Sequence, residues 1–189
     1  MANEVVFKRS THNPILTPEM LGGDVKAIHN SGITRYGDGY VGIFRIDDQG
    51  LREGLYRGTS PDGIHWKVES KRIEAKPAYP EIDDVIRLGF DQRITEIDGV
   101  YYITYCYWYH NHKYSIPSIL RTTDFETFEH LGFPLAPDNR NAVLFPRKIN
   151  GKFVMLHRPS GADDTDIFLS TSPDLIHWGE HRVVMEKGG

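Results

Sequence analysis

Three residues are the main candidates in this chain for moving a proton or holding an anion: Asp91 in FDQRIT, Arg140 in RNAVLFP and Arg158 in LHRP. A carboxylic acid in a buried or acidic environment can protonate a leaving oxygen. The planar fork of arginine matches phosphate oxygens two at a time. Taken alone, Asp91 is more typical of a turn residue that caps backbone amides, and each arginine of a surface ion pair. These residues carry chemistry only if the fold brings them together.

Other chemical motifs are missing from the sequence. His110 and His112 have one residue between them on a predicted loop, and no third ligand follows closely, so we predict a structural or solvent-facing role and no metal. There is no nucleophile elbow, phosphate-binding glycine loop or dinucleotide fingerprint. A net charge of −4 without a Lys/Arg cluster excludes the electrostatic footprint of a nucleic-acid binder.

The predicted compartment is the cytoplasm. The start, MANEVVFKRSTHNP, lacks the apolar core of a signal peptide, and no run approaches the roughly eighteen apolar residues of a membrane helix. The single cysteine, Cys106, cannot form an internal disulfide, which is typical of a reducing environment. We therefore expect a protein with no membrane contact.

The elements that must position the candidate residues form a threefold repeat. Each copy begins with a hairpin: ITRYGDGYVGIFRID, then ITEIDGVYYITYCYWY, then LFPRKINGKFVMLHRP. Gly39, Gly99 and Gly151 hold the turn of the hairpin in the three copies, where positive backbone angles favour glycine. Strands rich in β-branched and aromatic residues surround these turns, and no long segment shows helical spacing. The sequence therefore predicts an all-β fold.

A second hairpin in each copy ends in a shared turn signature. SPDGIHW occupies 60–66, SPDLIHW occupies 172–178, and TTDFETF at 122–128 is the degenerate middle copy. The 112 positions from Ser60 to Ser172 correspond to two repeats of about 56 residues, which is near the period of four-stranded propeller blades. The tryptophans are predicted to pack between blades rather than to stack on sugar.

The repeat predicts one partial β-propeller domain over 1–189, with blades at approximately 25–75, 85–135 and 140–189. Propellers typically close with four to eight blades, so three copies are too few. Either another segment is missing or chains complete one another, and we expect a truncated chain. A homo-oligomer is compatible with this organisation.

The segments NPILTPEML, AIHNSGI, FRIDD, FDQRITEIDGVYYITY, RNAVLFPRKINGKFVMLHRP and DIFLSTSPDLIHWG together resemble the mannoside phosphorylases of glycoside hydrolase family 130. The resemblance covers essentially the whole chain and implies a five-bladed β-propeller, of which about three blades are present here. Within the family, it is closest to the branch acting on β-1,4-mannosides such as mannosyl-N-acetylglucosamine and mannooligosaccharides. Two further blades would supply part of the phosphate and sugar sites.

The resemblance also implies a reaction. Asp91 matches the general acid of the family, whose proton passes through a hydroxyl of the bound mannose, and Arg140 and Arg158 match the arginines that contact phosphate. Phosphate is itself a nucleophile, so no second carboxylate is needed to activate water. The implied products are α-mannose 1-phosphate and a free sugar, with inorganic phosphate as co-substrate and no cofactor.

Further residues are expected at the substrate. Asn30 and Ser31 would hold the mannose with Arg45, which Asp47 or Asp48 would orient, although HNSG is equally typical of a plain turn. Phe90 and aromatic residues of the run from Tyr105 to His112 could stack on the leaving sugar. The remaining candidates for sugar or phosphate contact are Arg93, Asn141 and His157.

One position departs from the family pattern, because Gln92 follows Asp91 where proline is common, and this removes a backbone restraint beside the acid. Two rival functions remain. An inverting β-mannosidase on the same fold would replace the arginines by carboxylates that activate water, so retention of Arg140 and Arg158 argues against it. A non-catalytic sugar-binding module remains plausible for a partial propeller. The acceptor sugar and the linkage are not fixed by the sequence.

Overall fold

A computed structural model describes residues 7–79, 89–109, 113–160 and 165–188. In these residues almost all regular structure is strand, which confirms the predicted all-β class. The elements in chain order are α1 (Pro18–Leu21), β1 (Val25–Tyr36), β2 (Gly39–Asp48), β3 (Glu53–Ser60), β4 (Lys67–Arg72), β5 (Ala75–Pro77), β6 (Gly89–Ile97), β7 (Val100–Tyr109), β8 (Tyr114–Thr122), β9 (Phe128–His130), β10 (Asn139–Leu144), β11 (Phe153–Pro159), β12 (Ile167–Ser172) and β13 (Gly179–Met185).

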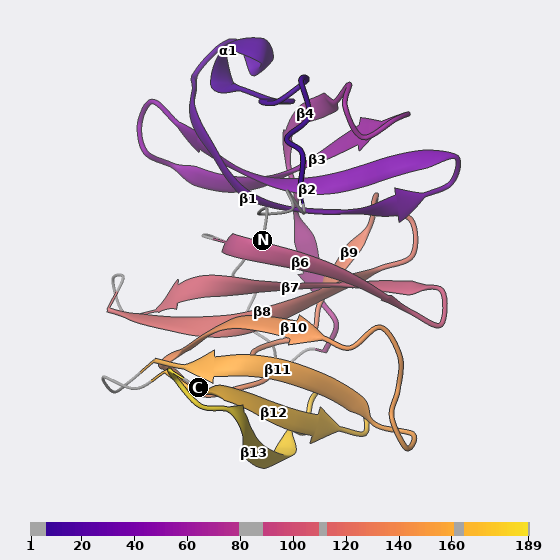
Figure 1. Ribbon diagram of the computed structural model, residues 1–189, viewed down its shortest axis with the longest axis vertical. Coiled ribbons are helices and arrows are strands. Elements are labelled where there is room, and N and C mark those ends of the chain that lie inside the picture. The colour runs from indigo at the N-terminus through magenta and orange to yellow at the C-terminus, as the bar shows by residue number, and fades with distance from the viewer. Residues whose placement is uncertain (1–6, 80–88, 110–112, 161–164, 189) are drawn as a thin grey trace, which may run out of the picture.

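The strands form three sheets stacked one on another in chain order (Figure 1). The first sheet has the order β1-β2-β3-β4 and the third has the order β10-β11-β12-β13. The middle sheet, β5-β9-β8-β7-β6, takes an extra strand because β5 pairs in parallel with β9 at its outer edge. This strand lies between the first two sequence repeats and ties the first blade to the second.

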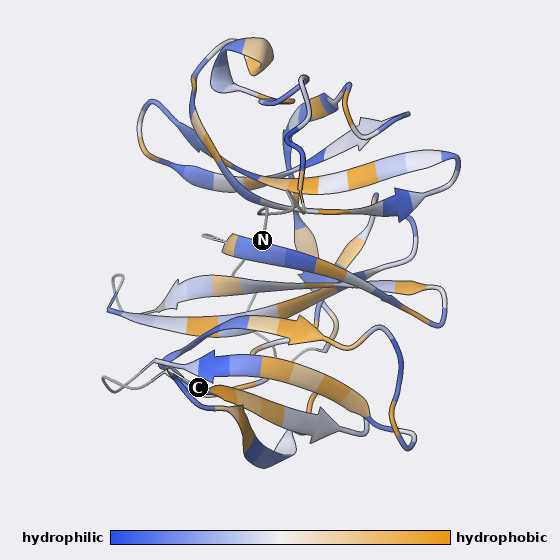
Figure 2. Cartoon of the chain, in the orientation of Figure 1, coloured by the Kyte–Doolittle hydropathy of each residue, from blue (hydrophilic) through white to orange (hydrophobic). Residues whose placement is uncertain are grey.

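The hydrophobic core lies between the sheets. Alternate residues of one strand face different neighbours: Ile103 of β7 lies in the core shared with the first sheet, whereas Tyr102 lies in the core shared with the third. Figure 2 shows the resulting mixture of hydrophobic and hydrophilic residues along the strands. Because buried apolar area stabilises by about 25 cal/mol per Å², these two cores set how the inner strands sit relative to one another.

The hairpin turns differ in one copy from the sequence prediction. Gly99 and Gly151 have the expected positive φ of 77° each. In the first copy the positive φ of 56° belongs to Gly37 instead. Gly39 is required for a different reason, because a Cβ there would lie 2.5 Å from the carbonyl oxygen of Ser60. The same glycine position thus serves turn geometry in the second and third blades and close packing in the first.

The aromatic residue that ends each second hairpin packs on one side of its blade. Phe128 lies in the core between the first two sheets, and Trp178 packs against the core between the second and third. The predicted packing between blades is therefore confirmed for Trp178. Trp66, the equivalent residue of the first blade, contacts Phe44 at a ring-centroid distance of 5.1 Å and lines a hollow with residues of the N-terminal segment, so the predicted packing between blades is not seen for Trp66.

Candidate functional site

Each sheet has a bulge at the same place in its innermost strand. The pairing shifts between His29 and Gly32 in β1, between Phe90 and Arg93 in β6, and between Arg140 and Val143 in β10. A bulge of this kind re-aims a side chain and is enriched next to functional sites. The first bulged residues are Asn30, Asp91 and Asn141, with φ of 33°, 57° and 58°.

These three residues are of the types that tolerate positive φ best among non-glycine residues. The strain of such a conformation persists where the surrounding structure fixes it, and it concentrates at functional sites. Here the strain recurs at one position in three successive blades. Each innermost strand thus carries a polar residue at the same position, the first residue of its bulge.

Asp91 is joined to the first blade. Its side chain is half-buried, and its Oδ1 accepts a short hydrogen bond from Nδ2 of Asn30. No residue in the described ranges bonds to Oδ2 of Asp91. One carboxylate oxygen is therefore fixed, and the other is open to a ligand.

Arg140 and Arg158 stand opposite each other on β10 and β11. Both are half-buried, and neither guanidinium has a hydrogen bond or ion pair with any other residue that the structure describes. The Nε of Arg140 is buried without a partner. The surface ion pair that composition alone favours is thus not formed within the described part of the chain. Two adjacent unpaired guanidinium groups make a site suited to an anion.

The buried thiol of Cys106 links these groups. Cys106 is fully buried, and its Sγ accepts a hydrogen bond from the backbone N–H of Asn141 at 3.1 Å. The pKa of this thiol is raised to about 11, chiefly because burial disfavours the thiolate; the hydrogen bond from Asn141 lowers the pKa, the charge of Asp91 raises it, and the charges of Arg140 and Arg158 lower it. All three charges therefore lie close enough to act on one sulfur atom, so the structure brings the candidate acid and both arginines together.

Arg45 is held by two carboxylates. Asp47 accepts from its Nε at 3.2 Å and from its Nη2 at 3.3 Å, and Glu53 accepts from Nη2 at 2.8 Å. The orienting residue is thus Asp47. Asp48 instead accepts from the backbone N–H and the Nε of Arg52 within the next turn. The contribution of Glu53 escaped the sequence analysis, although it pairs directly with Asp47 across the β2–β3 hairpin.

Phe90 does not offer an open face for a sugar. Its side chain is 5% exposed and stacks on Trp108 with 4.7 Å between ring centroids. The guanidinium of Arg45 lies 5.9 Å from its ring. The ring of Phe90 therefore packs against the guanidinium of Arg45. The half-buried Trp108 is the more accessible ring of the stacked pair. The neighbouring His110 and His112 lie outside the described residues.

His157 points into its own blade. It is 4% exposed, its Nδ1 pairs with the side chain of Asn139 at 3.0 Å, and its Nε2 pairs with Oγ of Ser170 at 2.7 Å. Ser170 continues the chain to Nδ1 of His181 at 2.6 Å. Burial and His181 together lower the pKa of His157 to about 4. A direct contact between His157 and substrate is therefore not supported, and its role is to join the strands that carry Arg140 and Arg158.

An open cavity of about 520 Å³ lies where the three inner strands meet. It brings together Asn30 and Ser31 from β1, Arg93 from β6 and Val143 from β10. Nη1 of Arg93 also donates to the carbonyl oxygen of Gln92 at 2.8 Å. A concave site with a few convergent polar groups is the usual form of a sugar site.

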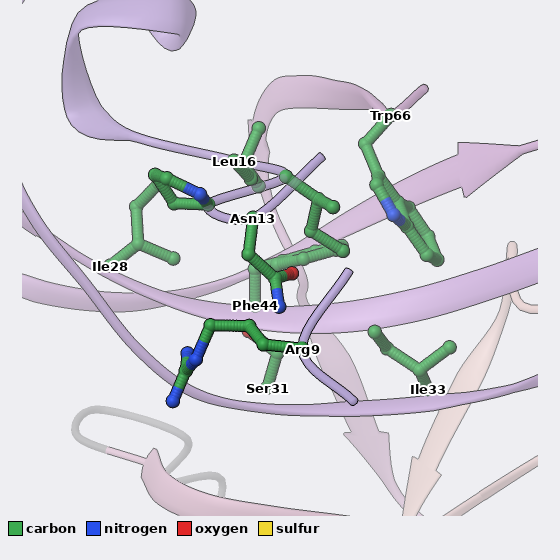
Figure 3. A pocket seen from close by; sticks show the side chains of 10 residues that line it. Arg9, Asn13, Leu16, Ile28, Ser31, Ile33, Phe44 and Trp66 are labelled. Carbon is green, nitrogen blue, oxygen red and sulfur yellow. The ribbon is translucent and has the colours of Figure 1, made fainter. Parts of the chain in front are cut away.

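A second hollow, of about 490 Å³, shares Ser31 and Ile33 with this cavity but has a different character (Figure 3). Its walls are Ile28, Phe44 and Trp66 from the first sheet, and residues of the N-terminal segment cover it. In the other two blades, the residues equivalent to Trp66 lie in cores between sheets. We therefore interpret this hollow as a packing face and not as the functional site.

The described residues contain neither a cluster of metal-ligating side chains nor a helix that could span a membrane. No three His, Cys, Asp or Glu side chains converge in a way that could hold a metal ion. In the same part of the chain, the one helix, α1, is far too short to cross a membrane.

The sequence profile of the β-1,4-mannooligosaccharide phosphorylases, glycoside hydrolase family 130, matches residues 22–187. A β-1,4-mannooligosaccharide phosphorylase of Ruminococcus albus is 39% identical over 188 residues, which cover 95% of this chain and 55% of that protein. A β-1,2-mannobiose phosphorylase of Listeria innocua is 35% identical over 130 residues, covering 67% of this chain and 34% of that protein.

Solved structures agree on the fold. The complex of the β-1,2-mannobiose phosphorylase from Listeria innocua with β-1,2-mannobiose matches with a TM-score of 0.77 at 22% identity, covering 94% of this chain and 65% of that one. The chain thus forms part of a five-bladed propeller fold. It spans about half the length of the Ruminococcus albus relative.

Proposed function

This chain belongs to glycoside hydrolase family 130, and from that premise we propose that it acts in the inverting phosphorolysis of β-mannosides to α-mannose 1-phosphate. β-1,4-Mannooligosaccharides or β-1,4-mannosyl-N-acetylglucosamine are the proposed substrates, because the relative with 39% identity is named for β-1,4-mannooligosaccharides. We also propose a cytoplasmic location, in line with a single buried thiol at Cys106.

The observation that carries this proposal is a pair of arginines that have no acidic partner among the residues that the structure describes. Arg140 and Arg158 are paired in register on β10 and β11. The charges of both arginines and of Asp91 influence the pKa of the same thiol, Cys106. Holding two like charges side by side is unfavourable unless an anion joins them. Inorganic phosphate has the charge and the paired oxygens that two guanidinium forks can bind.

The sugar would occupy the cavity lined by Asn30, whose side chain bonds to Asp91. Asn30, Ser31 and Arg93 line it with polar groups, and Asn141 presents a further amide from the third blade. Arg45 would contribute as a fixed donor, because Asp47 and Glu53 hold its guanidinium in place. Fixed polar side chains of this kind orient sugar hydroxyls by hydrogen bonding.

The proposed reaction is a single displacement. A phosphate oxygen held by Arg140 and Arg158 forms a bond to the anomeric carbon while the bond from that carbon to the glycosidic oxygen breaks. The departing oxygen takes a proton that originates from Asp91 and passes through a hydroxyl of the mannose. Attack from the face opposite the leaving group converts the β-mannoside into an α-phosphate.

Hydrolysis is less well supported. An inverting mannosidase needs a second carboxylate to activate water. Two acidic groups on the first blade, Asp47 and Glu53, are engaged with Arg45. Replacing phosphate by water would also leave Arg140 and Arg158 without a counter-charge. The geometry therefore favours phosphorolysis.

The test is the release of α-mannose 1-phosphate from β-1,4-mannobiose and from mannosyl-N-acetylglucosamine, with and without inorganic phosphate. We expect product only with phosphate. Free mannose in its absence would favour the mannosidase. No turnover together with measurable sugar binding would favour a non-catalytic sugar-binding module.

A further inference from the structure

Two buried side chains of β7 bond to consecutive residues of β10, the strand that carries Arg140. Oγ1 of Thr104 donates to the carbonyl oxygen of Ala142 at 2.6 Å, and Sγ of Cys106 accepts from the N–H of Asn141 at 3.1 Å. Thr104 is 1% exposed and Cys106 is fully buried. Asn141 and Ala142 are the bulged residues of β10. The two bonds therefore hold the bulge itself.

The same segment of β7 also flanks the bulge of Asp91. In the β6–β7 ladder Cys106 pairs with Phe90, and Thr104 pairs with Arg93, so the two bulged residues of β6 lie between these pairs. Residues 104–106 are thus joined to the acid-bearing strand by backbone pairing and to the arginine-bearing strand by side chains. One short segment fixes both halves of the candidate site.

These side-chain hydrogen bonds connect strands of two different sheets, which share no backbone ladder in the described part of the chain. The inner strand β10 pairs with β11 of its own sheet, and it contacts β6 and β7 across the core. A buried carbonyl or N–H that loses its partner keeps the full cost of its desolvation. The position of β10 against β7 is therefore sensitive to single atoms of Thr104 and Cys106.

We propose that Thr104 and Cys106 are positioning residues that set the placement of the Arg140–Asn141 segment relative to Asp91. The inference rests on the proposed function, because it concerns the phosphate site. Neither residue touches the phosphate in this account, since both act through the backbone of β10. A displacement of about 1 Å between reacting groups can cost roughly 100-fold in rate, so small shifts of β10 matter.

The experiment compares three variants for inorganic phosphate binding by calorimetry and for thermal stability. Thr104→Val removes the hydroxyl with little change of volume, and Thr104→Ser keeps it. Thr95→Val is the matched control, because Oγ1 of Thr95 makes a similar buried bond to the carbonyl oxygen of Leu144 at 3.3 Å, farther along β10 from Arg140.

We expect Thr104→Val to weaken phosphate binding about tenfold and Thr104→Ser to restore it to within about twofold. Thr95→Val is expected to lower the Tm by a similar amount while leaving the phosphate affinity unchanged. Equal affinities for wild type and Thr104→Val would overturn the inference alone. If the wild-type chain binds no phosphate, the proposed phosphate site fails as well.

A second variant keeps the inference testable if Thr104→Val does not fold. Cys106→Ala removes the acceptor of the Asn141 N–H, so hydrogen exchange of that amide should quicken and phosphate binding should weaken. Faster exchange with unchanged phosphate affinity would show that the bond is structural only, and would contradict the positioning role.

Discussion

The outer turns and the inner bulges of the blades use polar side chains in opposite ways. At the outer turns, Asp62, Asp124 and Asp174 each accept two backbone N–H bonds of 2.8 to 2.9 Å, and these bonds lower the pKa of all three carboxyls. At the inner bulges, counting only the described residues, Oδ2 of Asp91 has no partner and the Nε of Arg140 is buried without one.

The comparison separates stability from function within one repeat. The turn carboxylate is the same residue in all three copies, and its bonds close locally. The bulge residue keeps the same backbone distortion but changes from Asn30 to Asp91 to Asn141. Satisfied polar groups stabilise the fold, whereas polar groups left open in a defined geometry are free to bind.

The largest expected effect is on the inner side. Asp91→Asn keeps the size and the hydrogen-bonding shape of the side chain but removes the proton donor, so turnover should fall by about 10²- to 10⁴-fold. The Tm should stay close to that of the wild type, because the side chain is only half-buried. Initial rates of mannose 1-phosphate release and a thermal melt measure the two quantities. Unchanged turnover would refute the assignment of the acid.

A smaller, more selective effect is expected for Arg158→Ala. Loss of one charge-assisted pair of bonds to phosphate should raise the KM for phosphate about tenfold or more, with little change in the KM for the mannoside. Arg121→Ala is a suitable control, because Arg121 is paired with Glu129 on the outer part of the second blade. A KM for phosphate that does not change would remove Arg158 from the anion site.

The outer turns should respond in stability alone. Asp124→Asn weakens the bonds to Glu126 and Thr127, so the Tm should fall by a few degrees at neutral pH while the KM values of the remaining folded protein stay unchanged. Backbone hydrogen bonds hold the pKa of Asp124 at about 2, below the ordinary value of 3.8 for an aspartic acid.

Because the folded-state pKa is depressed, the stabilisation by Asp124 is present above the unfolded value and is lost as pH falls toward 2. The difference in Tm between wild type and Asp124→Asn should therefore shrink between about pH 4 and pH 2. A difference that does not change with pH would show that the lost stability does not come from the carboxylate charge.

The smallest effect is expected at His157, which joins the inner strand β10 to β12 of the same blade. Its pKa of about 4 is depressed because burial and His181 disfavour the charged ring, so wild-type stability should decline as pH falls from about 6.5 toward 4. His157→Gln, which keeps a polar partner for Asn139, should lessen that decline and raise the KM for phosphate only slightly. Thermal melts across this pH range test the expectation, and a parallel decline in both proteins would contradict it.

The sequence made the outer turns visible because their bonds are local. SPDGIHW and SPDLIHW carry the hydroxyl, the carboxylate and the aromatic ring within seven residues, so the repeat could be read directly. The all-β class followed from the same short-range pattern. The convergence of Asp91, Arg140 and Arg158 was expected from the family resemblance and not from spacing.

The inner bulges could not be read in this way. A bulge forms where two residues of one strand lie opposite a single residue of the partner strand. No residue type in β6 or β10 indicates this one-residue mismatch in the sequence. The mismatch also decides which side chains turn inward, which explains why Phe90 and His157 proved to be buried supports. Cys106 escaped the sequence analysis as a site residue, because its place opposite Phe90 depends on the same shift.

The central claim is that Arg140 and Arg158, which have no acidic partner in the described part of the chain, bind inorganic phosphate. Calorimetric titration of phosphate into the wild-type chain and into the Arg140→Ala/Arg158→Ala variant tests this claim most directly. The account predicts saturable phosphate binding by the wild type and loss of this binding in the variant. Binding by the wild type should weaken at high chloride, because salt screens the charges of phosphate and of the two arginines. Equal phosphate binding by both proteins, or none by the wild type, would contradict it.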